Sequence, residues 1–147
     1  MLTAQEMSDR FEIQDLVFHY ADCIDRLQFD ALEHVFTEDA HIDYTAVGGP
    51  KGSRNEIIDF LKQALIAFKT YQHLNANVQI RVNGDIASGR VMCFNPQELK
   101  LGKGKTHLFM LGIWYNDTYV RTPAGWRIQS RTEEKSWAFN VPEFMSL

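Results

Sequence analysis

Apolar residues near the start of the chain recur at intervals of three and four positions. With successive residues placed about 100° apart, one stripe contains Ile13, Leu16, Val17, Tyr20 and Ile24. Thr3 and Glu6 have the spacing of a capping box, so a helix is expected from Thr3 to about Arg26. A second, short helix is expected from about Asp30 to Phe36, with its apolar side toward the core.

A short strand and a third helix are predicted next. Residues 40–45 alternate, with Ala40, Ile42 and Tyr44 on one face, which is typical of a strand. The glycine-rich stretch from Gly48 to Gly52 predicts a loop. Ser53 can cap a helix whose apolar stripe consists of Ile57, Ile58, Leu61, Leu65 and Phe68.

The second half of the chain has the period of β-strands. From His73 to Val82 apolar residues alternate with polar ones, so His73, Asn75, Asn77, Gln79 and Arg81 are expected on one face. Asn83-Gly84 predicts a hairpin turn. Further strands are expected at 86–94, 108–115 and 126–139, with a loop at 100–105.

The strand at 108–115 is apolar on both faces, which indicates that both faces are covered. Helices would cover one face, and a second subunit is the simplest cover for the other. Helices that precede a run of antiparallel strands predict an α+β fold, with three N-terminal helices packed on a strongly curved, mostly antiparallel sheet. We expect a single domain over residues 1–147, with a cone-shaped pocket between helix and sheet.

Composition and charge narrow the classes of protein. Hydrophobic residues make up 45% of the 147 residues, which is typical of a globular chain. The net charge of −4 argues against a nucleic-acid partner. Two cysteines, Cys23 and Cys93, are too few for a disulfide framework and lack metal-site spacing. No secretory signal or membrane span is visible, so a cytoplasmic protein is expected.

Several polar residues are candidates for chemistry, each with a plainer alternative. Asp25 lies at the shoulder of the first apolar stripe, either at the rim of a pocket or simply at a helix end. His73 and Asn75 lie on the polar face of their strand, which either faces solvent or lines the cavity and binds ligand. His41-x-Asp43 is only a two-ligand fragment, so no metal site is expected.

Three motifs resemble one known family. The pattern Phe18-x-x-Ala21-Asp22-x-x-Asp25-x-x-x-x-Asp30-x-Leu32, the tripeptide Ile42-Asp43-Tyr44 and the pair Gln72-His73 are similar to segments of scytalone dehydratase. The run Ile13-Gln14-Asp15-Leu16, followed by Asp25 and His73, also resembles γ-hexachlorocyclohexane dehydrochlorinase. Both belong to the SnoaL-like group of the NTF2-like superfamily, and the resemblance covers nearly the whole chain.

The resemblance implies a candidate catalytic set. In both relatives the residues that match Asp25 and His73 form a catalytic dyad. An aspartate that accepts a hydrogen bond from one ring nitrogen fixes the histidine tautomer and leaves the other nitrogen as a base. Tyr44 matches a tyrosine that helps to polarise a substrate carbonyl, although it could equally be a core tyrosine. Arg131 resembles an active-site arginine of the dehydrochlorinase, or it is a surface or interface arginine.

The residues expected to bind the substrate depart from both relatives. Tyr20 stands where the dehydrochlorinase has a lysine, which argues against dechlorination, and Ile24 replaces a tyrosine of scytalone dehydratase. A second histidine of that enzyme falls near Asn95, and its serine and asparagine fall near Ile113 and Tyr115. A different substrate is therefore expected.

These observations favour a cofactor-independent, dehydratase-like lyase that acts on a small, largely apolar cyclic or aromatic-like substrate. An isomerase that uses the same base is a close alternative. A binding protein without catalysis and a β-type subunit of a ring-hydroxylating oxygenase are others. Relatives form trimers or dimers, so a homo-oligomer is expected, without a nucleic-acid or membrane partner.

Overall fold

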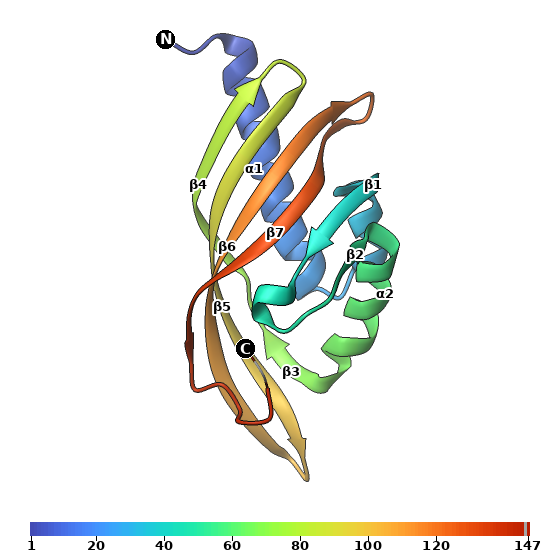
Figure 1. Cartoon of the computed structure of the whole chain (residues 1–147), viewed down its shortest axis with the longest axis vertical. Helices are drawn as coiled ribbons and strands as arrows, with labels where there is room; N and C mark the ends of the chain where they lie inside the picture. The colour runs from blue at the N-terminus through green and yellow to red at the C-terminus, as the bar shows by residue number, and fades with distance from the viewer. Residues whose placement is uncertain (146) are drawn as a thin grey trace.

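The computed structural model of the protein describes residues 1–145 and 147. A seven-stranded mixed sheet and two α-helices form most of it (Figure 1). In chain order these elements are α1 (Ala4–Asp25), β1 (Phe36–Asp43), β2 (Lys51–Ser53), α2 (Arg54–Ala64), β3 (Phe68–Tyr71), β4 (Leu74–Asn83), β5 (Ile86–Gly102), β6 (Lys105–Thr122) and β7 (Gly125–Phe139). Three short 3₁₀ turns are η1 (Phe29–His34), η2 (Thr45–Val47) and η3 (Leu65–Ala67).

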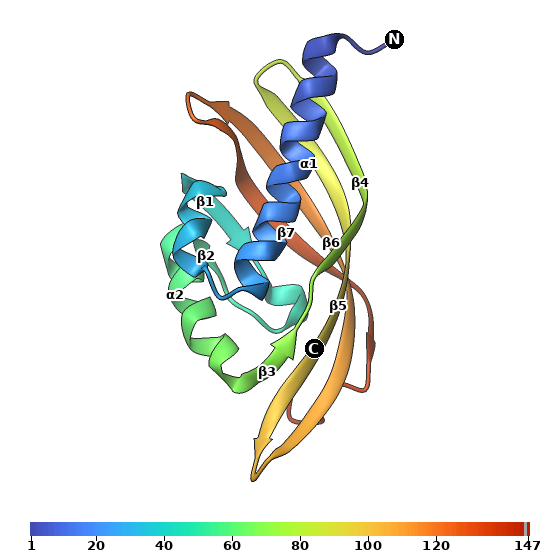
Figure 2. The same ribbon diagram turned by 180° about the vertical axis from the view of Figure 1, so that it is seen from behind.

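Helix α1 lies across the concave side of the sheet, as Figure 2 shows. Its start has the predicted capping box: the Glu6 amide donates to the Thr3 hydroxyl, and the Thr3 amide donates to the Glu6 carboxylate. Its end is a Schellman motif, in which Leu27 adopts a left-handed conformation (φ 59°) and the Gln28 amide donates to the Cys23 carbonyl. This turn stops the helix directly after Asp25.

The strands form a sheet in the order β2-β1-β7-β6-β5-β3, with β4 also paired to β5. Strands β1 and β7 are parallel, and the other pairs are antiparallel. The sheet curves without closing, and the long β5–β6 hairpin extends past the helices in Figure 1. Helix α2 and the strands β1 and β2 complete the side of the molecule on which the cavity lies.

The prediction of three N-terminal helices was not confirmed, because only two of the three segments are α-helices. The segment expected as a helix at Asp30–Phe36 is a 3₁₀ turn, Phe29–His34, and Phe36 already belongs to β1. Phe29 and Leu32 are both buried, and a 3₁₀ turn places residues three apart on the same side. The expected strand 40–45 is Phe36–Asp43, with Thr45 in η2.

The third predicted helix was right at its start and too long at its end. Helix α2 has a second capping box, Ser53 with Glu56, and buries Ile57, Ile58 and Leu61 as expected. It ends at Ala64, so Leu65 lies in η3, and Phe68 begins a strand that the sequence did not reveal. Part of the expected loop at 48–52 is likewise strand β2.

Strand β4 does not alternate strictly, which corrects a prediction about its faces. A β-bulge lies between Ala76 and Gln79, where Asn77 has a left-handed conformation (φ 47°). The extra residue moves every later side chain to the opposite face. Before the bulge the side chain of Asn75 points inward and Leu74 is exposed; after it, the partly buried residues are Val78, Ile80 and Val82.

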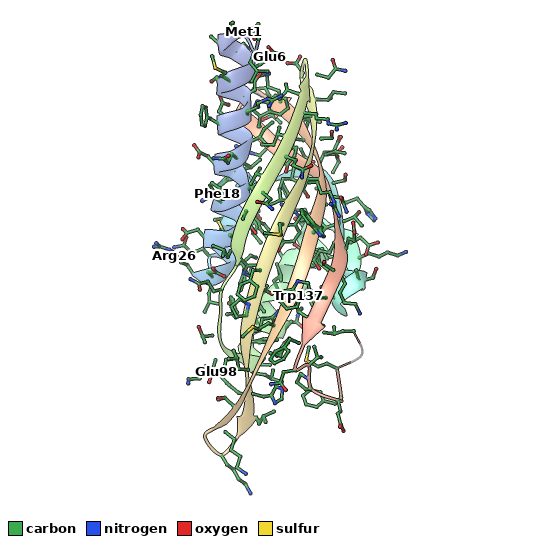
Figure 3. All side chains as sticks on the ribbon, turned by 90° about the vertical axis from the view of Figure 1, so that its left-hand side faces the viewer. Met1, Glu6, Phe18, Arg26, Glu98 and Trp137 are labelled. Carbon is green, nitrogen blue, oxygen red and sulfur yellow. The ribbon has the colours of Figure 1, made fainter. Side chains whose placement is uncertain are left out.

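Strand β7 contains two similar irregularities in its register with β6. One lies between the pairs Thr118–Ser130 and Tyr119–Ile128, and the other between Gly112–Trp137 and Ile113–Lys135. Between them, Arg131 and Glu133 are buried on the inner side of the sheet. Beyond the second one, Trp137 lies on the outer face (Figure 3).

The predicted two-sided strand at 108–115 is covered unequally within this chain. Phe109, Leu111, Ile113 and Tyr115 are buried under the helices, whereas Leu108 on the other face is half exposed. The outer face carries further apolar side chains around the labelled Trp137 in Figure 3. Among the described residues, no helix is both long enough and apolar enough to span a bilayer.

Candidate active site

A cavity of about 240 Å³ lies between α1, α2 and the concave face of the sheet. Its wall is largely apolar, with contributions from both α-helices, the sheet and the loop after β1. The apolar lining consists of Ile24, Val47, Phe60, Leu61, Ala64, Leu65, Phe68, Phe109, Leu111, Ile113 and Met145. A few polar groups converge on it: Tyr20, Tyr44, Tyr71, His73, Asn95, Gln97 and Glu133. An apolar chamber with a few polar groups is typical of a site for a small organic ligand.

Asp25 and His73 are in direct contact, although 48 residues separate them. The Asp25 carboxylate accepts from the ring Nδ1 of His73 at 2.7 Å and from the His73 backbone amide at 3.0 Å. Because a carboxylate only accepts, Nδ1 carries the hydrogen of this bond, and in the neutral ring Nε2 then keeps its lone pair. His73 lines the main cavity, whereas Asp25 contacts it from behind, beside a shallow outer pocket that both residues share.

The Schellman turn and the start of β4 explain this pairing. Helix α1 stops at Asp25, so the carboxylate projects from its last turn toward the residue that precedes β4. Tyr71 lies beside the pair: its hydroxyl donates to the Ile24 carbonyl, and its ring meets the His73 imidazole edge-on. Two oxygens of Asp25 therefore orient both the backbone and the ring of His73.

Tyr20 and Tyr44 form a second polar pair in the cavity wall. Their hydroxyls are 2.6 Å apart, and either oxygen can donate. Burial raises the pKa of Tyr20 to about 12 and raises the pKa of Tyr44 well above its usual value, so both hydroxyls keep their protons at neutral pH. Since one hydroxyl donates to the other, the pair retains a hydrogen for a ligand acceptor.

Arg131 lies behind this wall, and it is absent from the described residues that line the cavity. Its guanidinium donates two hydrogen bonds to Asp117, at 2.8 and 2.7 Å, and both side chains are fully buried. The same guanidinium stacks between the rings of Tyr20 and Tyr115, about 4 Å from each centroid. Arg131 thus supports Tyr20, the one of these two tyrosines that lines the cavity.

The expected substrate-binding residues divide into two groups. Tyr20, Ile24 and Ile113 line the cavity. Asn75 and Tyr115 are not among its described lining residues: the Asn75 amide donates to the Val17 carbonyl of α1, and Tyr115 packs against Arg131 and Tyr20. Asn95, which was expected near the site, does line the cavity, and its amide donates to the Gln72 carbonyl.

Glu133 is a polar residue of the cavity that the sequence interpretation missed. It is 8% exposed, and its Oε2 has no hydrogen-bond partner within the described residues. Burial raises the pKa of Glu133 to about 8, with Asp117 and Asp43 acting in the same direction and Arg131 against it. One signal was available: Glu133 is two positions after Arg131 on one strand, and residues two apart on a strand lie on the same face.

The His41-Asp43 fragment is used locally. Asp43 accepts from the amide and the hydroxyl of Thr45 and so begins the turn η2. Among the residues that the structure describes, no group of three or more histidine, cysteine or acidic side chains is arranged to hold a metal ion.

The sequence matches the family of SnoaL-like domains over residues 5–132. The chain therefore belongs to the SnoaL-like domain family, as its motifs suggested. An uncharacterized protein of Mycobacterium tuberculosis is 47% identical over 135 residues, which are 92% of this chain and 90% of that protein.

Solved structures share the fold. A proposed scytalone dehydratase of Novosphingobium aromaticivorans has a TM-score of 0.85 and 18% identity, with 99% of this chain and 95% of that chain covered. The hexachlorocyclohexane dehydrochlorinase LinA, type 2, has a TM-score of 0.80 and 17% identity, with 96% and 94% covered. At these identities the likeness establishes the NTF2-like fold alone.

Proposed function

We propose that this protein is a cofactor-independent lyase, dehydratase-like in its chemistry, that acts on a small and largely apolar cyclic substrate. His73 is the general base, and its Nε2 removes a proton from a carbon next to a carbonyl group. Asp25 is a positioning residue that fixes the His73 tautomer. The Tyr20–Tyr44 hydroxyl pair donates its one remaining hydrogen to the carbonyl oxygen as negative charge develops on it.

The single observation that carries this proposal is the 2.7 Å contact between Asp25 and the Nδ1 of His73, at a ring that lines an apolar cavity. A cavity of about 240 Å³ suits a compound of one or two rings. The family membership and the names of the structural neighbours, a dehydratase and a dehydrochlorinase, support elimination as the reaction class. Arg131, in this proposal, supports Tyr20 rather than touching the substrate.

An isomerase would use the same base and return the proton to another carbon. A binding protein would hold the same compounds without removing a proton. Hydrogen exchange in D₂O separates an enzyme, whether lyase or isomerase, from a binding protein. The probe is α-tetralone, a bicyclic ketone without a leaving group, because removal of a proton next to its carbonyl replaces the α-hydrogens by deuterium. If the wild type binds α-tetralone but leaves its exchange rate at the background value, the binding protein is favoured.

The catalytic assignment is tested with His73→Ala and Asp25→Asn. The substrate probe is the tetralone that carries a hydroxyl on the carbon β to its carbonyl, and loss of water is followed by absorbance. We expect His73→Ala to lower the elimination rate by roughly 10²–10⁴-fold and Asp25→Asn by at least about tenfold, since the base is lost or misoriented. Melting temperatures should stay within a few degrees of the wild type.

Matched controls are His41→Ala, an exposed histidine of β1, and Asp22→Asn, an exposed carboxylate one turn before Asp25. Both should retain the wild-type rate. Full activity in His73→Ala and Asp25→Asn would refute the assignment. Native mass spectrometry of the purified protein would show which small molecules it retains.

The homo-oligomeric state and the cytoplasmic location inferred from the sequence remain part of this proposal. The outer face of the sheet, with its exposed apolar side chains, is the surface on which subunits would meet.

A further inference from the structure

The cavity contains a buried carboxyl group for which the proposed function has no role so far. Glu133 lies on β7, opposite Tyr115 of β6, and its side chain lines the same cavity as His73. Its Oε2 lacks a hydrogen-bond partner within the described part of the chain. A buried polar atom without a partner is costly, so a bound molecule that supplies a partner would be favoured there.

Burial keeps the proton on Glu133, and the surrounding charges do not reverse this effect. The nearby cation, Arg131, is already neutralised by two hydrogen bonds to Asp117. Burial raises the pKa of Glu133 to about 8, with the carboxylates of Asp117 and Asp43 acting in the same direction and Arg131 against it. The titratable groups that face it from the surrounding elements are Tyr20 of α1, Asp43 of β1, Tyr44, Cys93 of β5, Tyr115 and Asp117 of β6, and Arg131 of β7. At neutral pH the cavity therefore holds an undissociated acid.

We propose that Glu133 is the general acid of this site, which donates its proton to the leaving hydroxyl of a β-hydroxy carbonyl substrate. The inference rests on the proposed function, because it assumes that His73 removes the α-proton. It adds a second catalytic residue and a substrate class.

The proposed step balances as follows. The Nε2 of His73 takes the α-proton, and the electrons of that C–H bond form the new C=C bond. The C–O bond at the β-carbon breaks, and the departing oxygen takes the Glu133 proton to become water. The products are an α,β-unsaturated carbonyl compound, a protonated His73 and an ionised Glu133. Transfer of the histidine proton to the carboxylate, through water, restores both groups.

A carboxylic acid at this place selects among leaving groups. Hydroxide leaves carbon poorly unless it is protonated as it departs, whereas chloride leaves as a stable anion. An acid that is protonated at neutral pH is therefore useful for loss of water and unnecessary for loss of chloride. Glu133 thus points to β-hydroxy carbonyl compounds rather than to halides.

The kinetic test compares two probes that differ only in the leaving group, the β-hydroxytetralone used above and its β-chloro counterpart. Glu133→Gln keeps the size and the hydrogen-bonding amide but cannot donate an acidic proton. We expect it to slow loss of water by at least about 100-fold and loss of chloride by less than about threefold. Glu134→Gln, the next residue on β7 but exposed and bonded to Arg90, is the matched control and should change neither rate.

An infrared measurement tests the protonation without a substrate. The wild type should show the C=O stretch of an undissociated carboxyl at pH 6, which disappears with a midpoint near pH 8. The difference spectrum against Glu133→Gln assigns the band. If this band is absent at pH 6, Glu133 is ionised and the inference is overturned, whatever the kinetics show.

The outcomes separate the two proposals. If His73→Ala slows both eliminations and Glu133→Gln slows only loss of water, both stand. If His73→Ala slows both eliminations and Glu133→Gln affects them equally or not at all, the inference fails and the proposed function stands. If His73→Ala leaves both rates unchanged, the proposed function fails, and the general-acid inference fails with it.

Discussion

Three ionisable residues on the inner face of the central strands have different environments. Arg131 and Asp117 are fully buried but neutralise each other through two hydrogen bonds. Glu133, on the same face, has no such partner within the described residues, so its neutral form is favoured. Burial penalises the charged form of each of these groups. Two hydrogen bonds offset this cost for Arg131 and Asp117, whereas Glu133 avoids it by keeping its proton.

At the residue scale, this predicts how stability changes with pH. The pKa of Glu133 is raised from about 4.5 in the unfolded chain to about 8 in the folded one, so the unfolded state releases this proton first. The stability that depends on the proton is present below pH 4.5 and is lost as the pH rises to 8. Glu133→Gln should therefore raise the free energy of unfolding at pH 8.5, on the order of 3–5 kcal/mol, with little gain at pH 4.

Urea unfolding of wild type and variant at both pH values measures this difference. Glu134→Gln, on the exposed face, is the control and should not gain stability selectively at high pH. An equal gain for Glu133→Gln at pH 4 and pH 8.5 would contradict the prediction, because the effect would then come from packing rather than from the proton.

At the element scale, β-bulges decide which polar side chains enter the molecule. The bulge at Asn77 allows Asn75 and His73 to face inward at one end of β4, while Val78, Ile80 and Val82 face inward at the other. The register shift near Ser130 does the same on β7 for Arg131 and Glu133. The inward orientation of both proposed catalytic groups, His73 and Glu133, thus depends on one extra residue in β4 and one in β7.

Asn77 should therefore tolerate glycine but not a β-branched residue. Its φ of 47° is left-handed, which Asn and Gly adopt readily and Val does not. We expect Asn77→Val to lower the free energy of unfolding by roughly 1–2 kcal/mol and to slow α-tetralone exchange, because the strand that orients His73 is disturbed. Asn77→Gly should match the wild type within about 0.5 kcal/mol.

Thermal unfolding and the exchange rate measure the two effects. Equal stability of the valine and glycine variants would show that residue 77 does not need the left-handed conformation, and the bulge would then not depend on its side chain.

At the scale of the whole molecule, the two faces of the sheet differ in what covers them. Helices α1 and α2 close the concave face over the cavity, as Figures 1 and 2 show. The outer face carries exposed apolar residues: Leu74, Leu108, Trp137 and Phe139. Trp137 packs on Phe94 and leaves no room for a side chain at Gly112.

We expect this face to form the contact of a homodimer or homotrimer. Sedimentation of the wild type should give a mass two or three times the 17.0 kDa of one chain. A charge on this face, as in Leu108→Glu, should shift the mass to that of one chain, because an unpaired charge is costly in an apolar interface. Lys62→Glu, on the exposed side of α2, is the control. A wild type that sediments as a single chain would disprove the expectation.

The sequence alone predicted much of the architecture and part of the site. The Thr3–Glu6 capping box, the Ser53 cap and the apolar stripes located both α-helices, and the alternation located the long strands. The motifs pointed to the family and to Asp25 and His73, which the structure brings into contact. Caps, apolar stripes and motifs each depend on residues that are close together in the sequence, so they can be recognised without the structure.

The tertiary structure decided which side chains face the cavity and in what state. A period of two specifies a face only until an extra residue interrupts it, and the position of a bulge depends on the partner strand. Strict alternation therefore failed on β4. The alternation from Arg131 to Glu133 is unbroken, but only the folded chain shows that Glu133 lines the cavity. Whether a carboxyl keeps its proton depends on its burial and its neighbours, which come from distant segments: Asp43, Asp117 and Arg131. For that physical reason the acid of this cavity became visible only in the folded chain.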